Sequence, residues 1–207
     1  MSIALTHGSS PNRFTARVTS REGSQSDEFL LKRIADGDQS ALRSLVGRHE
    51  VRVFRFITRL VGDRRRAEDL VSDTFMSVWQ GAGRFEGRSS VATWILAIAR
   101  YKSLNARKVL GPCEDPITDE VAGALVDDGP GPEDNLALCE QAATIRKCLR
   151  ALPKHQAELL DLVYYHEKSI HEVALIVGIP ENTVKSRMFL ARRKLAKMLV
   201  AEGLDRT

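Results

Sequence analysis

Apolar residues recur at steps of three and four along most of this chain, which places them on one face of an α-helix. In the first half, this spacing predicts four helices, over about 27–36, between Asp38 and Gly62, over about 64–80, and from Ser90 onward. No stretch there alternates valine or threonine with polar residues, as a half-buried strand would. The pattern therefore predicts an all-α fold.

The second half shows the same helical spacing. A stripe of Leu138, Ala142, Ile145 and Leu149 predicts a helix that ends before Pro153. Another helix is centred on the apolar run "LLDLV". Two more follow, "IHEVALIV" and "ENTVKSRMFLARRKLAKML", and a short Gly-Ile-Pro connection joins them.

That connection has the spacing of a helix-turn-helix. Ala174 supplies the small residue needed where the two helices cross, and Gly178 permits the positive φ of a sharp turn. Pro180 suits the entry to the next helix, where its missing N–H would be unpaired in any case. An ordinary helical hairpin is the alternative interpretation of this pattern.

The last predicted helix has an apolar face and a basic one. The apolar face holds residues at helical intervals, namely Val184, Met188, Ala191, Leu195 and Leu199. A recognition helix lies in the major groove of DNA and reads base edges with side chains near its N-terminus. The opposite face carries the candidate DNA contacts, which are Asn182, Lys185, Ser186, Arg187, Phe189, Arg192, Arg193 and Lys194.

The chemistry of these side chains divides their expected roles. Lys185 can donate to guanine O6 and N7, and Phe189 can contact a thymine methyl group. Arg192, Lys194 and Lys197 are better placed for phosphates, which contribute affinity without sequence information. For any single base, the alternative is a solvated helix face.

Charge divides the chain into modules. Residues 111–135 contain eight acids, no base and four of the seven prolines, so they carry −8 in a chain whose net charge is +4. The other residues therefore carry +12. Such an acidic, proline-rich stretch buries too little apolar surface to fold. We predict a disordered tail over 1–25, a helical domain over 26–110, an acidic flexible linker over 111–135 and a second helical domain over 136–207.

The sequence indicates neither an enzyme nor a metal site. His166 and His171 in "HEKSIHE" are five residues apart, which puts them on different sides of a helix. The three cysteines form no CxxC pair, and no phosphate loop or nucleophile–base pair is present. We therefore predict no catalytic residue, no cofactor, no metal and no small-molecule substrate.

Compartment is predicted from the apolar segments and the cysteines. No apolar run reaches the roughly 20 residues of a membrane span. The first 25 residues lack the apolar core of a secretory signal. These features predict a reduced, cytoplasmic protein without membrane insertion.

Three motifs follow one another along the chain, "AEDLVSDTFMSVW", "RFEGRSSVATWILAIAR" and "IPENTVKSRMFLARRKL". Together they resemble a bacterial sigma factor of the small, two-domain extracytoplasmic-function (ECF) class. The resemblance covers about 26–110, as region 2, and 136–200, as region 4. It implies a protein that catalyses nothing itself and gives promoter specificity to core RNA polymerase. Promoter DNA, both as duplex and as melted strand, is then a second partner.

The resemblance also implies a polymerase-docking surface on the helix that contains "AEDLVSDTFMSVW". The matching residues are Glu68, Asp69, Leu70, Asp73 and Phe75. In such an interface, acids supply steering and specificity, and apolar side chains supply affinity. Simple core packing is an equally open interpretation of Leu70 and Phe75.

The following loop and helix match the part of the family that holds the melted minus-ten element. The matching residues are Arg84, Phe85, Arg88, Arg100, Tyr101, Lys102 and Asn105. Many members have asparagine where this chain has Tyr101, which leaves the base preference at that promoter position open. Trp94 fits core packing better than base stacking.

In the same resemblance, the helix-turn-helix reads the minus-thirty-five element. The family further implies a role in a stress response and an anti-sigma factor that holds the protein inactive. The alternative is a helix-turn-helix transcriptional regulator that acts without polymerase. Such a regulator would need a dimerisation surface, and the first half shows no obvious dimer heptads.

Overall fold

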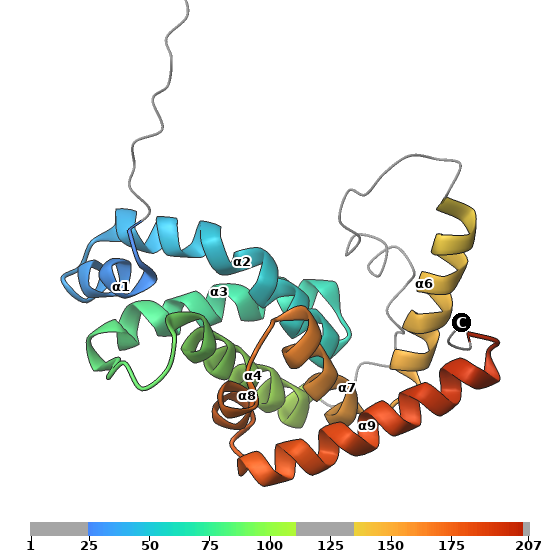
Figure 1. Ribbon diagram of the computed structural model, residues 1–207. Coiled ribbons are helices and arrows are strands. Elements are labelled where there is room, and N and C mark those ends of the chain that lie inside the picture. The colour runs from blue at the N-terminus through green and yellow to red at the C-terminus, as the bar shows by residue number, and fades with distance from the viewer. Residues whose placement is uncertain (1–24, 111–134, 205–207) are drawn as a thin grey trace, which may run out of the picture.

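The computed structural model describes residues 25–110 and 135–204, and every regular element in these two stretches is helical (Figure 1). The predicted all-α fold is therefore confirmed. Except for their last positions, the predicted tail and linker lie outside the described residues. Cys113, in the linker, also lies outside them. Within the described ranges, no helix is long and apolar enough to cross a bilayer.

Four helices and one short turn form the N-terminal module. They are α1 (Asp27–Ala35), α2 (Gln39–Val61), α3 (Arg64–Gly81), the 3-10 turn η1 (Ala82–Arg84) and α4 (Val91–Leu110). The central helix is α2, which packs against α1, α3 and α4. It begins after Asp38, whose carboxylate accepts the Ser40 N–H at 2.8 Å, and it ends at Gly62 with a φ of 78°.

The C-terminal module consists of α6 (Asn135–Arg150), α7 (Lys154–Leu160), the π-helical turn η2 (Asp161–Tyr165), α8 (Ile170–Val177) and α9 (Glu181–Ala201). The sequence predicted one helix through "LLDLV", whereas the α-helical pattern changes to a π-helical one at Asp161. Asp161 and Leu162 at the start of this turn are both buried.

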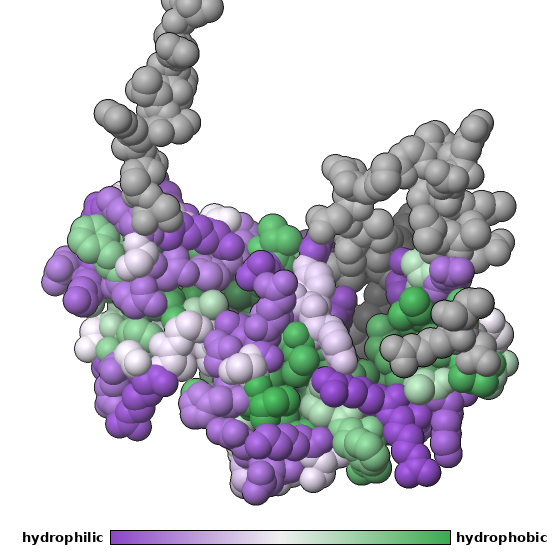
Figure 2. Space-filling view, viewed as in Figure 1, coloured by the Kyte–Doolittle hydropathy of each residue, from purple (hydrophilic) through white to green (hydrophobic). Residues whose placement is uncertain are grey.

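The two modules pack directly against each other. Helix α8 lies against α4, and α7 lies against α2 (Figure 1). Buried residues of both modules, among them Phe56, Ile95, Leu159 and Val173, belong to one connected apolar cluster. Figure 2 shows hydrophilic residues over most of the visible face, with hydrophobic ones gathered around α7, α8 and α9.

The connection between α8 and α9 is the predicted helix-turn-helix turn. Gly178 has a φ of 71°, and its N–H donates to the carbonyl of Ala174 at 2.8 Å. Pro180 directly precedes the first residue of α9, Glu181, where the sequence predicted the helix to begin. At the other end of α8, Ser169 and Glu172 form a capping box.

We expect the same substitution to have opposite effects at Gly178 and Gly47. Alanine at position 178 would adopt a left-handed conformation, so Gly178→Ala should lower the free energy of unfolding by about 1 kcal/mol. Gly47 lies inside α2, where no atom comes within 4 Å of an added Cβ. Gly47→Ala should therefore raise the free energy of unfolding by up to about 1 kcal/mol. Urea unfolding followed by circular dichroism measures both, and a shift of the same sign at the two positions would contradict this account.

Candidate nucleic-acid interface

The inner face of α9 is buried as its sequence predicts. Val184, Met188 and Ala191 are at most 2% exposed. Leu195 and Leu199 are half-buried farther along the helix. This packing fixes which side chains of α9 point outward.

Most of the predicted DNA contacts on α9 are solvent-exposed. The exposed residues are Asn182, Lys185, Ser186, Phe189, Arg192, Arg193 and Lys194, whereas Arg187 is half-buried. Phe189 is 65% exposed and its neighbour Leu190 is 51% exposed, so the outer side of α9 presents apolar as well as basic side chains. Ser186 donates its hydroxyl proton to the carbonyl of Asn182 at 2.9 Å, so its oxygen is free to accept a hydrogen bond.

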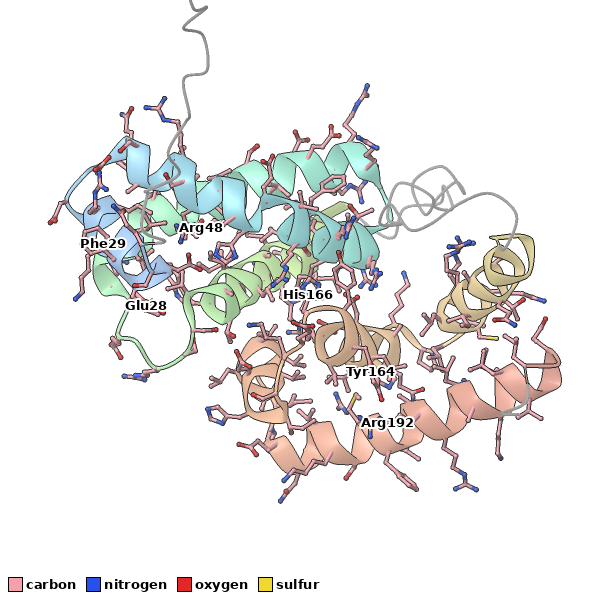
Figure 3. All side chains as sticks on the ribbon, turned by 45° about the horizontal axis from the view of Figure 1, so that its top comes forward. Glu28, Phe29, Arg48, Tyr164, His166 and Arg192 are labelled. Atoms are coloured by element: carbon pink, nitrogen blue, oxygen red, sulfur yellow. The ribbon has the colours of Figure 1, made fainter. Side chains whose placement is uncertain are left out.

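Two contacts hold side chains at the exposed face of α9 in place. His171 Nδ1 lies 2.9 Å from Glu181 Oε1 and so links α8 to the first residue of α9. The guanidinium of Arg192 lies 5.5 Å from the ring centre of Tyr164 (Figure 3). This cation–π contact gives Arg192 a partner within the protein, which the sequence did not indicate.

The predicted strand-binding residues around α4 differ in their accessibility. Tyr101 is 68% exposed, and Arg84 and Arg88 are exposed in and after η1. Phe85 packs against Trp94 with ring centres 5.2 Å apart, which is the core role expected for Trp94. Lys102 and Asn105 are half-buried, so the open part of this face centres on Tyr101 and the loop.

Arg100 does not lie on that open face. Its Nε donates to Glu158 Oε1 of α7 at 2.5 Å, and its side chain is 19% exposed. The sequence placed Arg100 with Tyr101 because both follow the same motif. Consecutive helical residues point about 100° apart, and this rotation turns Arg100 toward the C-terminal module.

Glu172 makes a second contact between the modules. Its Oε1 accepts hydrogen bonds from Thr93 at 2.6 Å and from Ser90 at 3.2 Å. Burial raises the pKa of Glu172, but hydrogen bonds from Thr93, the Ser169 backbone and Lys168 outweigh it and lower this pKa to about 2. The carboxylate therefore stays charged at neutral pH.

A third contact joins α2 to η2. Arg59 forms an ion pair with Asp161, whose side chain is 6% exposed. The Arg59 guanidinium also lies 5.0 Å from the ring centre of Tyr165, and Arg55 donates to the Tyr165 hydroxyl. The sequence does not indicate these contacts of Arg55 and Arg59, because they depend on how the two modules dock.

His166 lies beside this contact, between the two modules (Figure 3). It is 3% exposed, and its ring lies edge-on to the rings of Phe56 and Tyr165. The ring centres are 5.4 and 5.0 Å apart, respectively. Neither ring nitrogen has a hydrogen-bond partner among the described residues, and Asp161 Oδ2 lies 3.6 Å from Nε2. Burial lowers the pKa of His166 to about 4, with further contributions from the positive charges of Arg59, Arg52 and Lys168.

On the predicted docking helix α3, the structure separates the acids from the apolar residues. Glu68, Asp69 and Asp73 are exposed. Leu70 and Phe75 are 7% and 5% exposed, and Leu70 packs in the core. Phe75 packs in the core as well, but it also lines a groove between α2 and α3.

We call this feature the α2–α3 groove. Its lining residues are Gln39, Leu42, Arg43, Ser72, Phe75, Met76 and Trp79. Met76 is 57% exposed and is the most accessible large apolar side chain there. It was not among the candidate contacts predicted from the sequence. Its place on the outer face of α3, one residue from buried Phe75, was a signal that could have identified it.

The two histidines of "HEKSIHE" have separate surroundings. His166 is buried between the modules, whereas His171 pairs with Glu181 on the surface. Across residues 25–110 and 135–204, no three histidine, cysteine or acidic side chains are grouped closely enough to hold a metal ion.

Two protein-family models match the chain, in the order of its modules. The model of sigma-70 region 2 matches residues 45–110, and that of sigma-70 region 4 matches residues 142–195. The first match includes α3, α4 and the loop between them, and the second includes α7, α8 and most of α9.

Individual proteins show the same similarity over most of the chain. The RNA polymerase sigma-H factor of Pseudomonas aeruginosa is 28% identical over 182 residues, which cover 84% of this chain and 94% of that protein. The ECF RNA polymerase sigma factor SigW of Bacillus subtilis is 28% identical over 177 residues, covering 82% and 94%. The solved structure of the sigma factor RpoE in complex with the anti-sigma factor NepR from Bartonella quintana matches with a TM-score of 0.58. It is 26% identical and covers 79% of this chain and 98% of that one.

Acid should weaken the fold through His166. An unfolded chain protonates this histidine as the pH falls below about 6.5, whereas the folded chain resists protonation down to about pH 4. The contribution of neutral His166 to the free energy of unfolding is therefore fully present above about pH 6.5. It declines as the pH falls, and ~2 kcal/mol of it is lost at pH 5. His166→Phe should remove this part of the pH dependence, and His155→Phe, at an exposed position of α7, should not. Urea unfolding at pH 7 and pH 5 tests this, and equal slopes for wild type and His166→Phe would contradict it.

Proposed function

The chain belongs to the ECF class of the sigma-70 family, and on that premise we propose that it binds core RNA polymerase and directs transcription initiation at a specific set of promoters. Members of this family are initiation factors without an enzymatic activity of their own. The observation that carries the proposal is that one chain has two exposed faces suited to DNA. One is the polar face of α9, which follows a helix-turn-helix turn, and the other is the aromatic and basic face around α4.

The two faces suit two forms of DNA. Lys185, Ser186 and Phe189 lie in the first part of α9, from which a recognition helix reaches base edges in a duplex. Tyr101 stands exposed on α4 with Arg84 and Arg88 in the preceding loop, and single strands are bound by such combinations of ring and cation. We assign the α9 face to the minus-thirty-five element and the α4 face to the melted minus-ten element.

We assign polymerase docking to α3 and the α2–α3 groove. Exposed Glu68, Asp69 and Asp73 supply negative charge, and Met76 and Trp79 supply apolar surface in the groove. An apolar centre beside charged residues is the usual composition of a specific protein interface. In this assignment, Leu70 supports the surface from the core and makes no direct contact with the polymerase.

We further propose that an anti-sigma factor holds the protein inactive until a stress signal releases it. The support is by analogy, since the similar sigma factor RpoE of Bartonella quintana was solved in complex with the anti-sigma factor NepR. The proposed partners, core polymerase and promoter DNA, place the protein in the cytoplasm in this proposal.

Run-off transcription with bacterial core polymerase tests the proposal, using DNA upstream of the protein's own gene and of neighbouring genes. We expect a transcript that depends on this protein and starts at one position. Tight binding to free duplex with no polymerase-dependent transcript would instead identify a regulator that acts alone.

Substitutions in α9 should then distinguish base-specific contacts from nonspecific attraction to DNA phosphates. Lys185→Ala should lower transcript yield by about tenfold or more, because a specific base contact is worth about 1–3 kcal/mol. Lys197→Ala removes the same charge from an exposed position nearer the end of α9 and should have a much smaller effect at the same salt concentration. Equal losses from the two substitutions would rule out base reading by Lys185.

Polymerase docking has its own test in the α2–α3 groove. Met76→Ala should weaken binding to core polymerase by about tenfold, as expected for an apolar contact at the centre of an interface. Val51→Ala is the matched control, because Val51 is a similarly exposed apolar residue of α2, outside the groove lining. Titration of fluorescently labelled protein with core polymerase measures both affinities. Unchanged binding of Met76→Ala would place the docking surface elsewhere.

A further inference from the structure

Two consecutive tyrosines of η2 each contact an arginine, and the two arginines belong to different helices. The Arg59 guanidinium of α2 lies over the ring of Tyr165, 5.0 Å from the ring centre. The Arg192 guanidinium of α9 lies over the ring of Tyr164, at 5.5 Å (Figure 3). Tyr165 therefore takes part in the joint between the modules, whereas Tyr164 contacts the helix with the proposed recognition face.

The backbone that carries Tyr164 is fixed by its neighbours. Leu160 and Leu162 are 3% and 0% exposed, and Asp161 forms the ion pair with Arg59. Helix α7, which leads into η2, packs against α9. Tyr164 itself is 63% exposed, so burial of apolar surface does not explain the position of its ring. The contact that the ring makes is the one with Arg192.

The charge of Arg192 is available to a ligand. In the part of the chain that the structure describes, no carboxylate forms an ion pair with this exposed residue. A guanidinium that lies over an aromatic ring keeps N–H donors at its edge, and a phosphate can accept two of them. The Tyr164 ring therefore restricts the guanidinium without using the donors that a phosphate needs.

Arg192 lies on the same side of α9 as Lys185. Seven residues make almost two full turns, so the two side chains differ by only about 20° around the helix and by about 10 Å along it. Lys185 is in the first part of α9, from which a recognition helix reaches base edges. A residue two turns farther along is beyond these base contacts and meets the sugar–phosphate backbone, where arginine is a common partner.

Holding this side chain in place favours binding. A long arginine side chain loses conformational entropy when it is fixed on a phosphate. The contact with Tyr164 already restricts Arg192 in the free protein, so less entropy remains to be lost when DNA binds.

We propose that Tyr164 is a positioning residue for promoter binding, whose ring orients the Arg192 guanidinium toward one phosphate of the minus-thirty-five duplex. The inference rests on the proposed function and deepens it, because the duplex-binding surface then depends on η2 as well as on α9. Tyr164 acts through Arg192, and its hydroxyl makes no contact with DNA in this arrangement. A phosphate contact carries no sequence information, so the effect is the same for every duplex.

Binding of a fluorescent, mixed-sequence DNA duplex to the free, full-length protein at low salt tests the role of the ring. Tyr164→Leu should lower the affinity about two- to fivefold, the effect of an exposed cation–π contact. Tyr164→Phe keeps the ring and should bind as wild type does. Phe29→Leu removes another exposed ring, on α1, and should leave the affinity unchanged. A loss in Tyr164→Phe equal to that in Tyr164→Leu would assign the effect to the hydroxyl and overturn the positioning role.

The dependence on Arg192 is tested by the slope of log affinity against log salt concentration. Arg192→Ala should reduce this slope by about 0.9, the value for one lost phosphate contact on a duplex. Lys32→Ala removes a charge from an exposed position of α1 and should leave the slope unchanged. An unchanged slope for Arg192→Ala would overturn the proposed phosphate contact.

The double variant shows whether the ring acts through the guanidinium. In the Arg192→Ala protein, Tyr164→Leu should cause no further loss of affinity, because no guanidinium remains for the ring to orient. A further loss as large as that in wild type would show that Tyr164 acts independently of Arg192, and would overturn the inference. Thermal unfolding checks that each variant is folded, and the rescue by Tyr164→Phe supplies a second answer if Tyr164→Leu is not.

These binding measurements need no polymerase, so their failure is distinguishable from failure of the proposed function. Unchanged affinity of folded Tyr164→Leu would overturn the positioning role, even with normal run-off transcription. Absence of duplex binding by wild type at low salt would overturn it as well. Absence of any polymerase-dependent transcript from wild type would count against the sigma function itself.

Discussion

Arg59 and Arg100 meet Asp161 and Glu158, two carboxylates whose side chains are 6% and 8% exposed, and the placement of both modules depends on this contact. Each arginine extends from the N-terminal module, and each carboxylate comes from the α7–η2 segment. Because isolated buried charges are so unfavourable, these pairs restrict the two modules to few relative positions. The helix-turn-helix follows from that docking, since it brings α8 onto α4 and leaves the basic face of α9 in solvent.

This docking gives α4 two sides with different accessibility. Tyr101 projects into solvent, whereas Arg100, the residue before it, is directed at α7. Thr93 contributes to the same covered side through Glu172. Successive positions of one helix therefore belong to an open surface and to a docked one.

Features set by neighbouring residues could be predicted from the sequence. The cap at Asp38, the turn at Gly178 and the buried face of Val184 and Met188 depend on local spacing, and the structure has all of them. Features set by docking could not. Nothing near Arg100 in the sequence indicates Glu158, which lies 58 positions away and belongs to the other module. For Leu70 the spacing was compatible with either core or surface, and only the packing of α3 decides for the core.

Charged residues form part of the joint between the two modules. Apolar residues of similar volume often give equal or greater stability than buried ion pairs, so stability alone does not explain the charges. His166 adds to the cost, because its buried ring has no hydrogen-bond partner among the described residues. A charged contact, however, can be exchanged for other charges or for water, which distinguishes it from the apolar packing that also joins the two modules.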